Sequence, residues 1–496
     1  LSNPEVLRIC IDRIKKAITL CKFLKQFLIA KDNPKLRTDK DHYSNKRVRL
    51  SGDLLATLFR VNLGILVRDI QYSLQKSSKR KKYFSIKVLA KSTLFSHRIE
   101  SAIATGSWTG ERSGITQNID KTNYLSTISQ LQRVSSMLPG DQENFMARTL
   151  HPTHYGRFCP IETPEGTEIG LRKNLAILAR VSTRVDLDEN KFMKELESLE
   201  LSREPIGNYD VFFNGMFIGT VEDGNKFVKQ IREKRRENLL PVQMSFREDE
   251  GIKTIYISTE SGRVLRPLVI VENGIPKLKS EHLVQIEQGE LTWKEILEKG
   301  IIEYVDAAEE ENALVAISEE ELTPEHTHLE IDPISLFGTV TSLVPYGNHD
   351  QSSRLNRGSK TQKQALGLYS ANYLSRLDTD VSVLQYPQKP IVRSFVYDTL
   401  STYPAGQNLV VAIMSYEGYN MEDALILNKG SLDRGLGRSF YFRPYSAIEM
   451  NYAGGLKDEI AMPEKDASGY RTESSYKHLE DDGIISPEAE VNEGEV

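Results

Sequence analysis

The sequence predicts a multi-domain protein of the α+β class. Its 496 residues suggest about three or four domains at roughly 100–200 residues each. Apolar residues recur at helical spacing between residues 51 and 75, whereas residues 181–340 alternate short β-like runs with acidic helical segments. The composition, 39% hydrophobic and 27% charged, is typical of a chain that builds packed cores rather than of a disordered polymer.

The composition also argues against several classes of protein. The apolar windows at 54–67 and 409–414 are interrupted well before the ~20 residues that a membrane helix needs, so neither a membrane span nor a membrane partner is expected. The three cysteines, Cys10, Cys21 and Cys159, include no CxxC pair. A disulfide framework and a cysteine-rich zinc site are therefore not expected, and a reducing, intracellular compartment fits the sequence.

The net charge of −5 hides a gradient along the chain. Residues 1–100 carry a net charge of +15, residues 101–180 carry +1, residues 181–340 carry −15, residues 341–440 carry +2, and residues 441–496 carry −8. An asymmetry of this size indicates that different faces of the protein meet different partners.

The basic segment, residues 1–100, contains apolar positions near helical spacing, which predict one or two amphipathic helices over Ser51–Gln75. The run Lys76, Lys79, Arg80, Lys81 and Lys82 follows them. Such a run suits contact with phosphates, and it equally suits a solvated loop that keeps the surface soluble. Charge alone leaves both interpretations open.

Residues 181–340 are predicted to form an acidic α+β region. Their negative charge favours a solvated module that contacts other proteins over one that contacts nucleic acid. Strands are predicted at Val211–Ile218, Thr254–Ser258 and Arg263–Val271, and helices at Phe227–Glu237 and Trp293–Lys299.

A glycine- and proline-rich stretch occupies Ala104–Leu171. Glycine and proline at this density specify turns with fixed dihedral angles. The backbone here is therefore expected to follow a defined series of turns rather than a regular helix or strand. Loops of this kind that carry Gln, Asn and Arg suit the binding of an extended polyanion. His151, His154 and Cys159 match no common zinc spacing, so a structural role is expected for them.

The stretch Pro345–Arg438 carries the other unusual polar residues. Arg354 precedes the pair Lys363-Gln364, which begins nine residues later, and a polar helix is predicted from there through Tyr373. An apolar strand is predicted at Leu409–Met414, shortly before the adjacent carboxylates Glu422 and Asp423. Such a pair can hold Mg²⁺ directly or through water, with an arginine balancing phosphate charge. Because adjacent Glu-Asp pairs are common, the pair alone favours an ordinary exposed turn.

Six strings supply the context that single residues lack. They occur in the order found in one family, and together they resemble the second-largest subunit of multisubunit DNA-directed RNA polymerase, called β in bacteria and B in archaea. The resemblance covers essentially the whole chain. Two strings, Asp-His-Tyr-Ser-Asn-Lys-Arg and Tyr-Pro-Gln-Lys-Pro, resemble the archaeal and eukaryotic branch, and an archaeal source is expected. The six strings are Asp39–Arg47, Ala104–Trp108, His151–Gly170, His349–Gln364, Tyr386–Pro390 and Gly418–Ala424.

The resemblance implies a division of the chain into regions. These are a lobe end and protrusion return (1–100), a fork (101–180), external domains (181–340), part of a double-psi β-barrel hybrid-binding domain (341–440), and the start of a wall or flap (441–496). Relative to this family the chain is expected to be a fragment that lacks both ends, including a zinc-binding clamp segment, so no zinc is expected in it. A cytoplasmic, nucleoid-associated location is implied.

The resemblance also implies partners and roles for single residues. The partners would be the largest polymerase subunit, which holds the first Mg²⁺, the assembly subunits, the DNA template, nascent RNA and nucleoside triphosphates. Arg354 would face the phosphates of the incoming nucleotide, and Glu422 with Asp423 would hold the second Mg²⁺. No contact is assigned to Gln130 or Gln132, which depart from the His or Arg common in the family. Contacts with the RNA–DNA hybrid or the RNA backbone would come from Gln117, Asp120, Asn123, Arg133, Lys363 and Gln364.

Two other functions are weighed against a part in polymerase catalysis. A nucleic-acid-binding scaffold without chemistry would account for the +15 segment and would bind DNA in a salt-sensitive way. A self-sufficient Mg²⁺ hydrolase built on Glu422 and Asp423 is disfavoured, because no third carboxylate or general base with a recognisable motif accompanies them.

Overall fold

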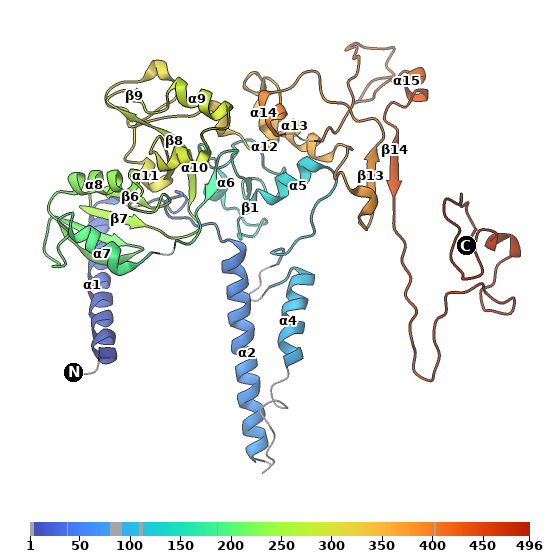
Figure 1. Ribbon diagram of the computed structural model, residues 1–496, viewed down its shortest axis with the longest axis horizontal. Helices are drawn as coiled ribbons and strands as arrows, with labels where there is room; N and C mark the ends of the chain where they lie inside the picture. The colour runs from blue at the N-terminus through green and yellow to red at the C-terminus, as the bar shows by residue number, and fades with distance from the viewer. Residues whose placement is uncertain (1–3, 37, 80–91, 109–112, 186, 401–402) are drawn as a thin grey trace. The chain divides into compact units, whose positions relative to one another are not determined.

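The computed structural model describes residues 4–36, 38–79, 92–108, 113–185, 187–400 and 403–496. The chain divides into two compact units. One comprises residues 1–371 and 383–439, and the other comprises residues 372–382 and 440–496. Helices are mixed with several small sheets (Figure 1), which confirms the predicted multi-domain α+β class.

Long helices occupy the basic N-terminal segment. Helix α1 spans Pro4–Asp32, and α2 spans Ser51–Lys79. The predicted amphipathic region is therefore a single helix, which packs against α4 (Ser92–Thr105) through the rings of Phe59 and Phe95, 5.1 Å apart. Of the basic run, Lys76 and Lys79 lie in the last turn of α2, whereas Arg80, Lys81 and Lys82 lie outside the described residues.

The first sheet of the acidic region has the strand order β5-β4-β7-β6, with β4 and β7 parallel. Ile255 of β7 joins a core made with α8, whereas the neighbouring Tyr256 lies beside Phe212 on the face that α1 covers. This arrangement follows from the alternation of side chains along a strand. The elements are β4 (Tyr209–Phe213), β5 (Met216–Val221), α8 (Gly224–Arg236), β6 (Ser245–Asp249) and β7 (Thr254–Ser258).

The prediction of one strand over Val211–Ile218 is wrong, because this stretch is a hairpin. Strand β4 ends at Phe213 and β5 begins at Met216. Asn214 and Gly215 connect them with φ values of 46° and 79°. A two-residue hairpin turn of type I′ needs positive φ at both positions, and Asn-Gly is a pair that adopts it readily.

The second sheet is built around β8 (Val264–Glu272), in which every residue except Glu272 is buried. This burial explains its nearly continuous apolar sequence and confirms the predicted strand. Strands β10 and β12 flank β8 in antiparallel pairing, with Ile302 opposite Val269 in the first pair. The remaining members are β3 (Arg180–Val181), β9 (Ile275–Pro276), β10 (Ile302–Asp306), β11 (Val315–Ala316) and β12 (His328–Leu329).

Buried ion pairs join the two sheets. Arg235 of α8 contacts Glu303 of β10 at 2.6 Å and Glu309 of α11 (Ala307–Glu310) at 2.8 Å. Burial raises the pKa of Glu303, but Arg235, His328 and Arg236 outweigh it and hold that pKa well below its usual range. The contact between the two sheets therefore includes a buried carboxylate, Glu303, whose ionised form is favoured by its cationic partners.

A buried arginine anchors the glycine- and proline-rich stretch to the second sheet. The Arg157 guanidinium is 1% exposed and donates to the carbonyls of Val264 and Val305 at 3.0 and 3.1 Å. It also forms an ion pair with Glu310 at 2.5 Å. These contacts fix the loops that follow residue 150.

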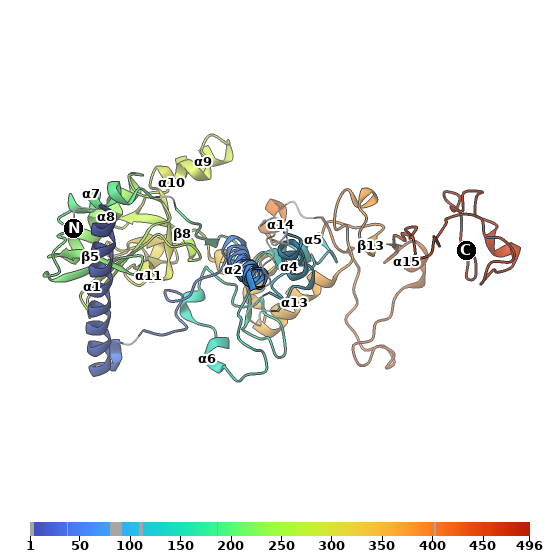
Figure 2. The same ribbon diagram turned by 90° about the horizontal axis from the view of Figure 1, so that it is seen from below.

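The elements of residues 113–181 and 333–364 carry most of the candidate site. Figure 1 shows α5, α12 and α13 packed close together, in agreement with their contacts, and Figure 2 shows α5 near α13 from another side. The elements are α5 (Tyr124–Leu131), β1 (Arg133–Ser135), α6 (Phe145–Arg148), η2 (Pro152–His154), β2 (Arg172–Asn174), η4 (Pro333–Leu336), α12 (Thr339–Ser342), η5 (Gly347–His349) and α13 (Ser352–Gln364).

Two predictions after residue 345 are wrong. The polar helix precedes rather than follows Lys363, because α13 ends at Gln364 and only the short η6 (Tyr373–Ser375) comes after it. Leu409–Met414 is not a strand, and its residues are exposed. A strand needs a neighbour that accepts its backbone hydrogen bonds, and no strand of the described residues pairs with this segment. No closed barrel is present in the part of the chain that the structure describes.

The other elements are short. The predicted helices at 227–237 and 293–299 are confirmed by α8 and α10. No helix of the described residues is long and apolar enough to cross a bilayer. The remaining elements are η1 (Pro34–Leu36), α7 (Glu189–Glu197), α9 (Ser280–Glu287), α10 (Trp293–Glu298), η3 (Glu319–Glu321), β13 (Val381–Leu384), α14 (Phe395–Leu400), α15 (Lys429–Asp433), β14 (Ser439–Phe442) and η7 (Glu473–Tyr476).

Candidate nucleic-acid interface

Asn123 joins the beginning of α5 to the end of α13. Its Oδ1 accepts a hydrogen bond from the Ser126 backbone N–H at 2.8 Å, which caps α5. Its Nδ2 donates to the carbonyls of Gln362 and Ala365, at 2.7 and 2.8 Å, in the last turn of α13. Asn123 is 1% exposed. One amide group therefore satisfies otherwise unpaired groups at two helix ends.

Lys363, near the end of α13, is held by a buried carboxylate. Its Nζ donates to Oε1 of Glu162 at 2.9 Å, across 201 residues of sequence. The Ser129 hydroxyl of α5 donates to the same oxygen at 2.6 Å, and Asn174 Nδ2 donates to Ser129 at 2.9 Å. Glu162 is 3% exposed, whereas 22% of the Lys363 side chain remains accessible. The ammonium group is thus fixed from one side and open on another.

Cations recur every three residues along α13, so the row winds part of the way around the helix. Arg354, Arg357 and Lys360 are exposed, and Lys363 is partly buried beside α5. Lys360 forms an exposed ion pair with Glu165 at 3.3 Å. The helix rests on its other face through Leu355 and Ser359, which are both buried. The opposite face of α13 therefore presents the row of positive charges to solvent.

Asp120, Gln117 and Arg133 flank α5. Asp120 Oδ1 accepts hydrogen bonds from the Thr122 backbone N–H at 3.0 Å and the Thr122 hydroxyl at 2.8 Å. Burial raises the pKa of Asp120, but hydrogen bonds from Thr122 and Ser126 and the charge of Arg133 outweigh it and lower the pKa. Gln117 is exposed and donates to the Gly114 carbonyl. Arg133 begins β1, where it pairs with Asn174 of β2.

Glu422 and Asp423 lie in an exposed loop. Both have positive φ, 54° and 65°, a backbone conformation that costs roughly 1–3 kcal/mol in a residue other than glycine. The loop is held upstream by Asn420, whose Nδ2 donates to the Met414 carbonyl at 2.6 Å. Among the described residues, no hydrogen bond or ion pair joins either carboxylate to Arg354 or Lys363.

Known proteins match this chain along its length. Family models for RNA polymerase Rpb2 match domain 3 at residues 117–181, domain 4 at 211–272, domain 5 at 293–333 and domain 6 at 340–496. The DNA-directed RNA polymerase subunit Rpo2 of Sulfolobus acidocaldarius is 43% identical over 98% of this chain, and that of Saccharolobus solfataricus is 42% identical over 98%. The DNA-directed RNA polymerase II subunit RPB2 of Encephalitozoon cuniculi is 33% identical over 97%.

The chain belongs to the family of second-largest RNA polymerase subunits. The family prediction is thereby confirmed, and the higher identity to the archaeal subunits agrees with the predicted archaeal affiliation. The chain spans about 45% of the length of these archaeal relatives.

The structure brings some of the predicted site residues together and leaves others apart. Asp120, Asn123 and Lys363 gather at the junction of α5 and α13. Arg354 lies near the opposite end of α13, Gln364 is exposed at its last residue, and the Glu422–Asp423 loop is separate. Gln130 and Gln132, to which no contact was assigned, bond internally: Gln130 accepts from the Asp120 N–H, and Gln132 accepts from Thr339.

The prediction from sequence missed Glu162 and Ser129. Glu162 lies in the Cys-Pro-Ile-Glu-Thr-Pro-Glu-Gly string, whose second glutamate, Glu165, is exposed. No local pattern distinguishes the buried carboxylate from the exposed one, because its partner Lys363 lies 201 residues away.

The two histidines considered for a metal site accept hydrogen bonds from backbone N–H groups. His151 caps η2 by accepting from the Thr153 N–H, and its Nε2 lies 3.2 Å from Asp39. His154 Nδ1 accepts from the His151 N–H at 3.2 Å. Burial, with Lys173 and His151 nearby, lowers the pKa of His154 to about 3, which keeps the ring neutral. The described residues contain no group of three or more His, Cys, Asp or Glu side chains arranged to hold a metal ion.

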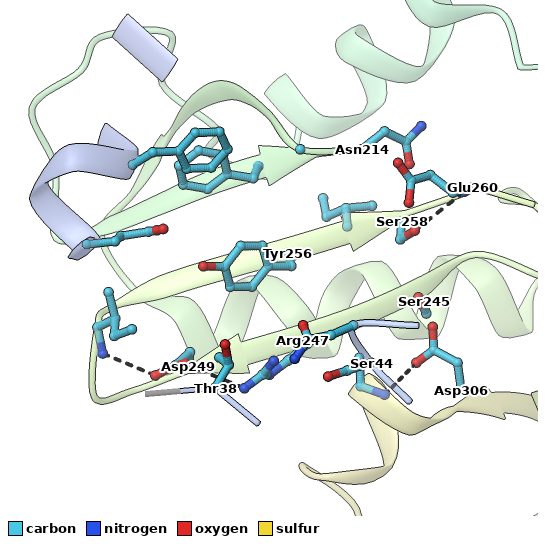
Figure 3. Close-up of a pocket in the computed structure, with 18 of the residues that line it drawn as sticks. Thr38, Ser44, Asn214, Ser245, Arg247, Asp249, Tyr256, Ser258, Glu260 and Asp306 are labelled. Carbon is cyan, nitrogen blue, oxygen red and sulfur yellow. Dashed lines mark hydrogen bonds and ion pairs between the residues drawn. The ribbon is translucent and has the colours of Figure 1, made fainter. Parts of the chain in front are cut away.

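A cavity of about 600 Å³ lies between α1, residues 36 and 38–47, and the first sheet (Figure 3). Aromatic residues such as Tyr256 and charged residues line it together. Its arginines already have anionic partners, because Arg47 contacts Glu260 at 3.3 Å and Arg247 contacts Glu311 at 2.9 Å. The cavity therefore presents no surplus of positive charge, and the α5–α13 junction remains the stronger candidate for binding a polyanion.

Proposed function

We propose that this chain forms part of the catalytic core of DNA-dependent RNA polymerase, a nucleotidyltransferase. Its role there is to bind the RNA–DNA hybrid, to contact the nucleotide phosphates and to position the second Mg²⁺. The row of cations on α13, whose last turn is locked against α5 by Asn123 and Glu162, carries the proposal. The largest subunit, the assembly subunits, the DNA template, nascent RNA and nucleoside triphosphates are the proposed partners.

The RNA-binding role falls to the end of α13. Lys363 has donors left over after its bond to Glu162, and Gln364 is exposed beside it, so both can donate to phosphate oxygens near the growing end of the RNA. Gln117, Asp120 and Arg133 would lie beside the hybrid on the α5 side. Asn123 is buried and its amide is already bonded, so we propose that it positions the two helices rather than touching nucleic acid.

Arg354 is proposed to contact the phosphates of the incoming nucleotide. Its guanidinium is exposed near the start of α13, and a planar fork of N–H donors suits phosphate oxygens. Phosphoryl-type transfer relies on positioning and on neutralising charge that develops on the leaving group. An arginine in this position would do both.

Glu422 and Asp423 are proposed to hold the second Mg²⁺. Carboxylate oxygens suit this ion, which usually keeps several waters and takes only one or two protein carboxylates. Two adjacent exposed carboxylates fit such a site, provided that water and substrate phosphates complete the coordination. When bound, the ion would neutralise charge on the nucleotide phosphates.

The proposal is tested in polymerase assembled with the complete subunit that carries Arg354→Ala. We expect a higher KM for nucleoside triphosphates and a lower kcat, because the contact serves both binding and the departing pyrophosphate. Single-nucleotide addition with rapid quenching measures both. Unchanged KM and kcat would contradict the phosphate role and favour a scaffold that binds nucleic acid without taking part in chemistry.

The metal role has a separate test in the double variant Glu422→Ala, Asp423→Ala. Loss of carboxylates that act on an ion, directly or through water, lowers the rate by roughly ten- to hundredfold. The defect should be largest at limiting Mg²⁺ and smaller at saturating Mg²⁺. A wild-type dependence of elongation on Mg²⁺ would remove Glu422 and Asp423 from the site.

A further inference from the structure

We infer that Glu162 is a positioning residue for RNA binding, which fixes the ammonium group of Lys363 toward the RNA backbone through a buried chain of hydrogen bonds. The inference rests on the proposed function, since it takes Lys363 as an RNA contact. It adds three residues, Glu162, Ser129 and Asn174, to which the sequence motifs assigned no role.

The position of the Glu162 carboxylate is set independently of Lys363. Ser129 donates to its Oε1 at 2.6 Å, and Asn174 holds Ser129 by donating to both its hydroxyl and its carbonyl at 2.9 Å. The exposed fractions of these three residues are 3%, 1% and 5%. The carboxylate thus has a buried partner besides the lysine, which is what a positioning group requires.

The backbone of Lys363 is fixed by the contacts of α13, the helix that carries it. Asn123 bonds to the carbonyls of Gln362 and Ala365, which bracket Lys363 in sequence. Ser359, one turn earlier in α13, bonds to Thr341 of α12 at 3.0 Å. The backbone of Lys363 and its ammonium group are thus both held, and the four-carbon side chain between them loses most of its rotameric freedom.

Immobilisation matters because a free lysine side chain carries about 2 kcal/mol of rotamer entropy, which is lost when it is ordered on a ligand. Lys363 has already lost that freedom in the absence of RNA. One of its three N–H donors points to Glu162, and 22% of its side chain remains accessible. The remaining donors can meet phosphate oxygens without further ordering.

A simpler reading is that Glu162 only neutralises Lys363. The two readings predict opposite signs for Glu162→Gln. If the glutamate withholds a cation from RNA, its removal frees the lysine and strengthens RNA retention. If it positions the lysine, its removal weakens retention although the site becomes more positive.

The test uses polymerase assembled with the complete subunit, halted in elongation complexes with end-labelled RNA. The rate of RNA release is measured between low and high salt for wild type, Glu162→Gln, Lys363→Gln and the double variant. We expect each single variant to release RNA roughly tenfold faster and to lower the salt slope by about 0.7–0.9, the share of one phosphate contact. The double variant should match either single variant within about twofold, because both remove the same contact.

Glu168→Gln is the matched control. Glu168 lies six residues from Glu162 and forms an exposed ion pair with Arg172 at 2.6 Å, with 41% of its side chain accessible. It should leave RNA release and its salt slope unchanged. Ser129→Ala is the second variant in case Glu162→Gln folds poorly. It keeps the carboxylate charge but removes the bond that fixes the carboxylate, and it should shift RNA release in the same direction.

The outcomes separate the inference from the proposed function. If Lys363→Gln leaves the salt slope at the wild-type value, the RNA contact itself is wrong. If Lys363→Gln lowers the slope but Glu162→Gln and Ser129→Ala do not, or if Glu162→Gln slows RNA release, the positioning role alone is overturned. Multiplying defects in the double variant would also overturn it, because they would mean that the two residues act independently.

Discussion

Replacing Asn123 should loosen α5 and α13 together. Asn123→Ala removes the cap of α5, worth about 1 kcal/mol. It also removes the donors to the carbonyls of Gln362 and Ala365, worth about 1 kcal/mol each. The loss of about 2 kcal/mol at the end of α13 corresponds to a roughly thirtyfold increase in local opening there, and the loss of about 1 kcal/mol at the start of α5 to a roughly fivefold increase. Hydrogen exchange of the amides at residues 360–364 and 126–128 measures it at each helix.

Asn123→Asp separates the two contributions. Aspartate caps a helix about as well as asparagine, so exchange at residues 126–128 should stay close to wild type. It has no N–H to donate and sets a negative charge against two carbonyls, so exchange at residues 360–364 should rise by tenfold or more. Unchanged exchange at residues 360–364 in Asn123→Asp would refute the idea that this side chain holds the end of α13.

Three further outcomes are expected elsewhere in the chain. The pKa of His154 is about 3 in the fold against 6.5 when unfolded, so the free energy of unfolding should be intact above pH 6.5 and fall by up to about 1.4 kcal/mol per pH unit below it. His154→Gln should flatten that fall in urea titrations from pH 7 to 5, and an equally steep fall in the variant would contradict the assignment. Arg157→Met removes a donor to the Val264 and Val305 carbonyls and a partner of the Glu310 carboxylate, and it should lower the free energy of unfolding by about 3–5 kcal/mol. A change below 1 kcal/mol in the same titration would show that the anchor is dispensable. Gly170→Ala should destabilise by more than 2 kcal/mol, because φ is 71° and an added Cβ would lie 2.2 Å from the Arg148 carbonyl oxygen. A neutral effect on the melting temperature would refute that close approach.

Periodic segments with nearby partners were predictable from sequence. Helix α8 and strand β7 have their hydrophobic pattern and their packing partners within about fifty residues, and the prediction placed both within three residues of their bounds. The hairpin at Asn214 was missed although its signal was present, because the apolar run on either side of the Asn-Gly pair was taken as a single strand.

Features that depend on distant partners were not predictable in the same way. Leu409–Met414 has a strand-like sequence, but a strand also requires a neighbour, which the described residues do not provide. The pairing of Glu162 with Lys363 links two ordinary charged residues, and only the fold reveals that one of them is buried. The predicted contact of Asn123 with the hybrid is untested, and the burial of its side chain and its bonds to α13 are the reason we propose a linking role instead.

The measurement that tests the central claim most directly is a cross-link from the growing end of the RNA. Polymerase assembled with the complete subunit is halted with a photoreactive nucleotide at the RNA 3′ end, irradiated, and digested to map the attached peptide. The account predicts a cross-link on this chain within residues 352–364, the helix that carries Arg354 and Lys363. Cross-links on this chain confined to the acidic region 181–340 would contradict it.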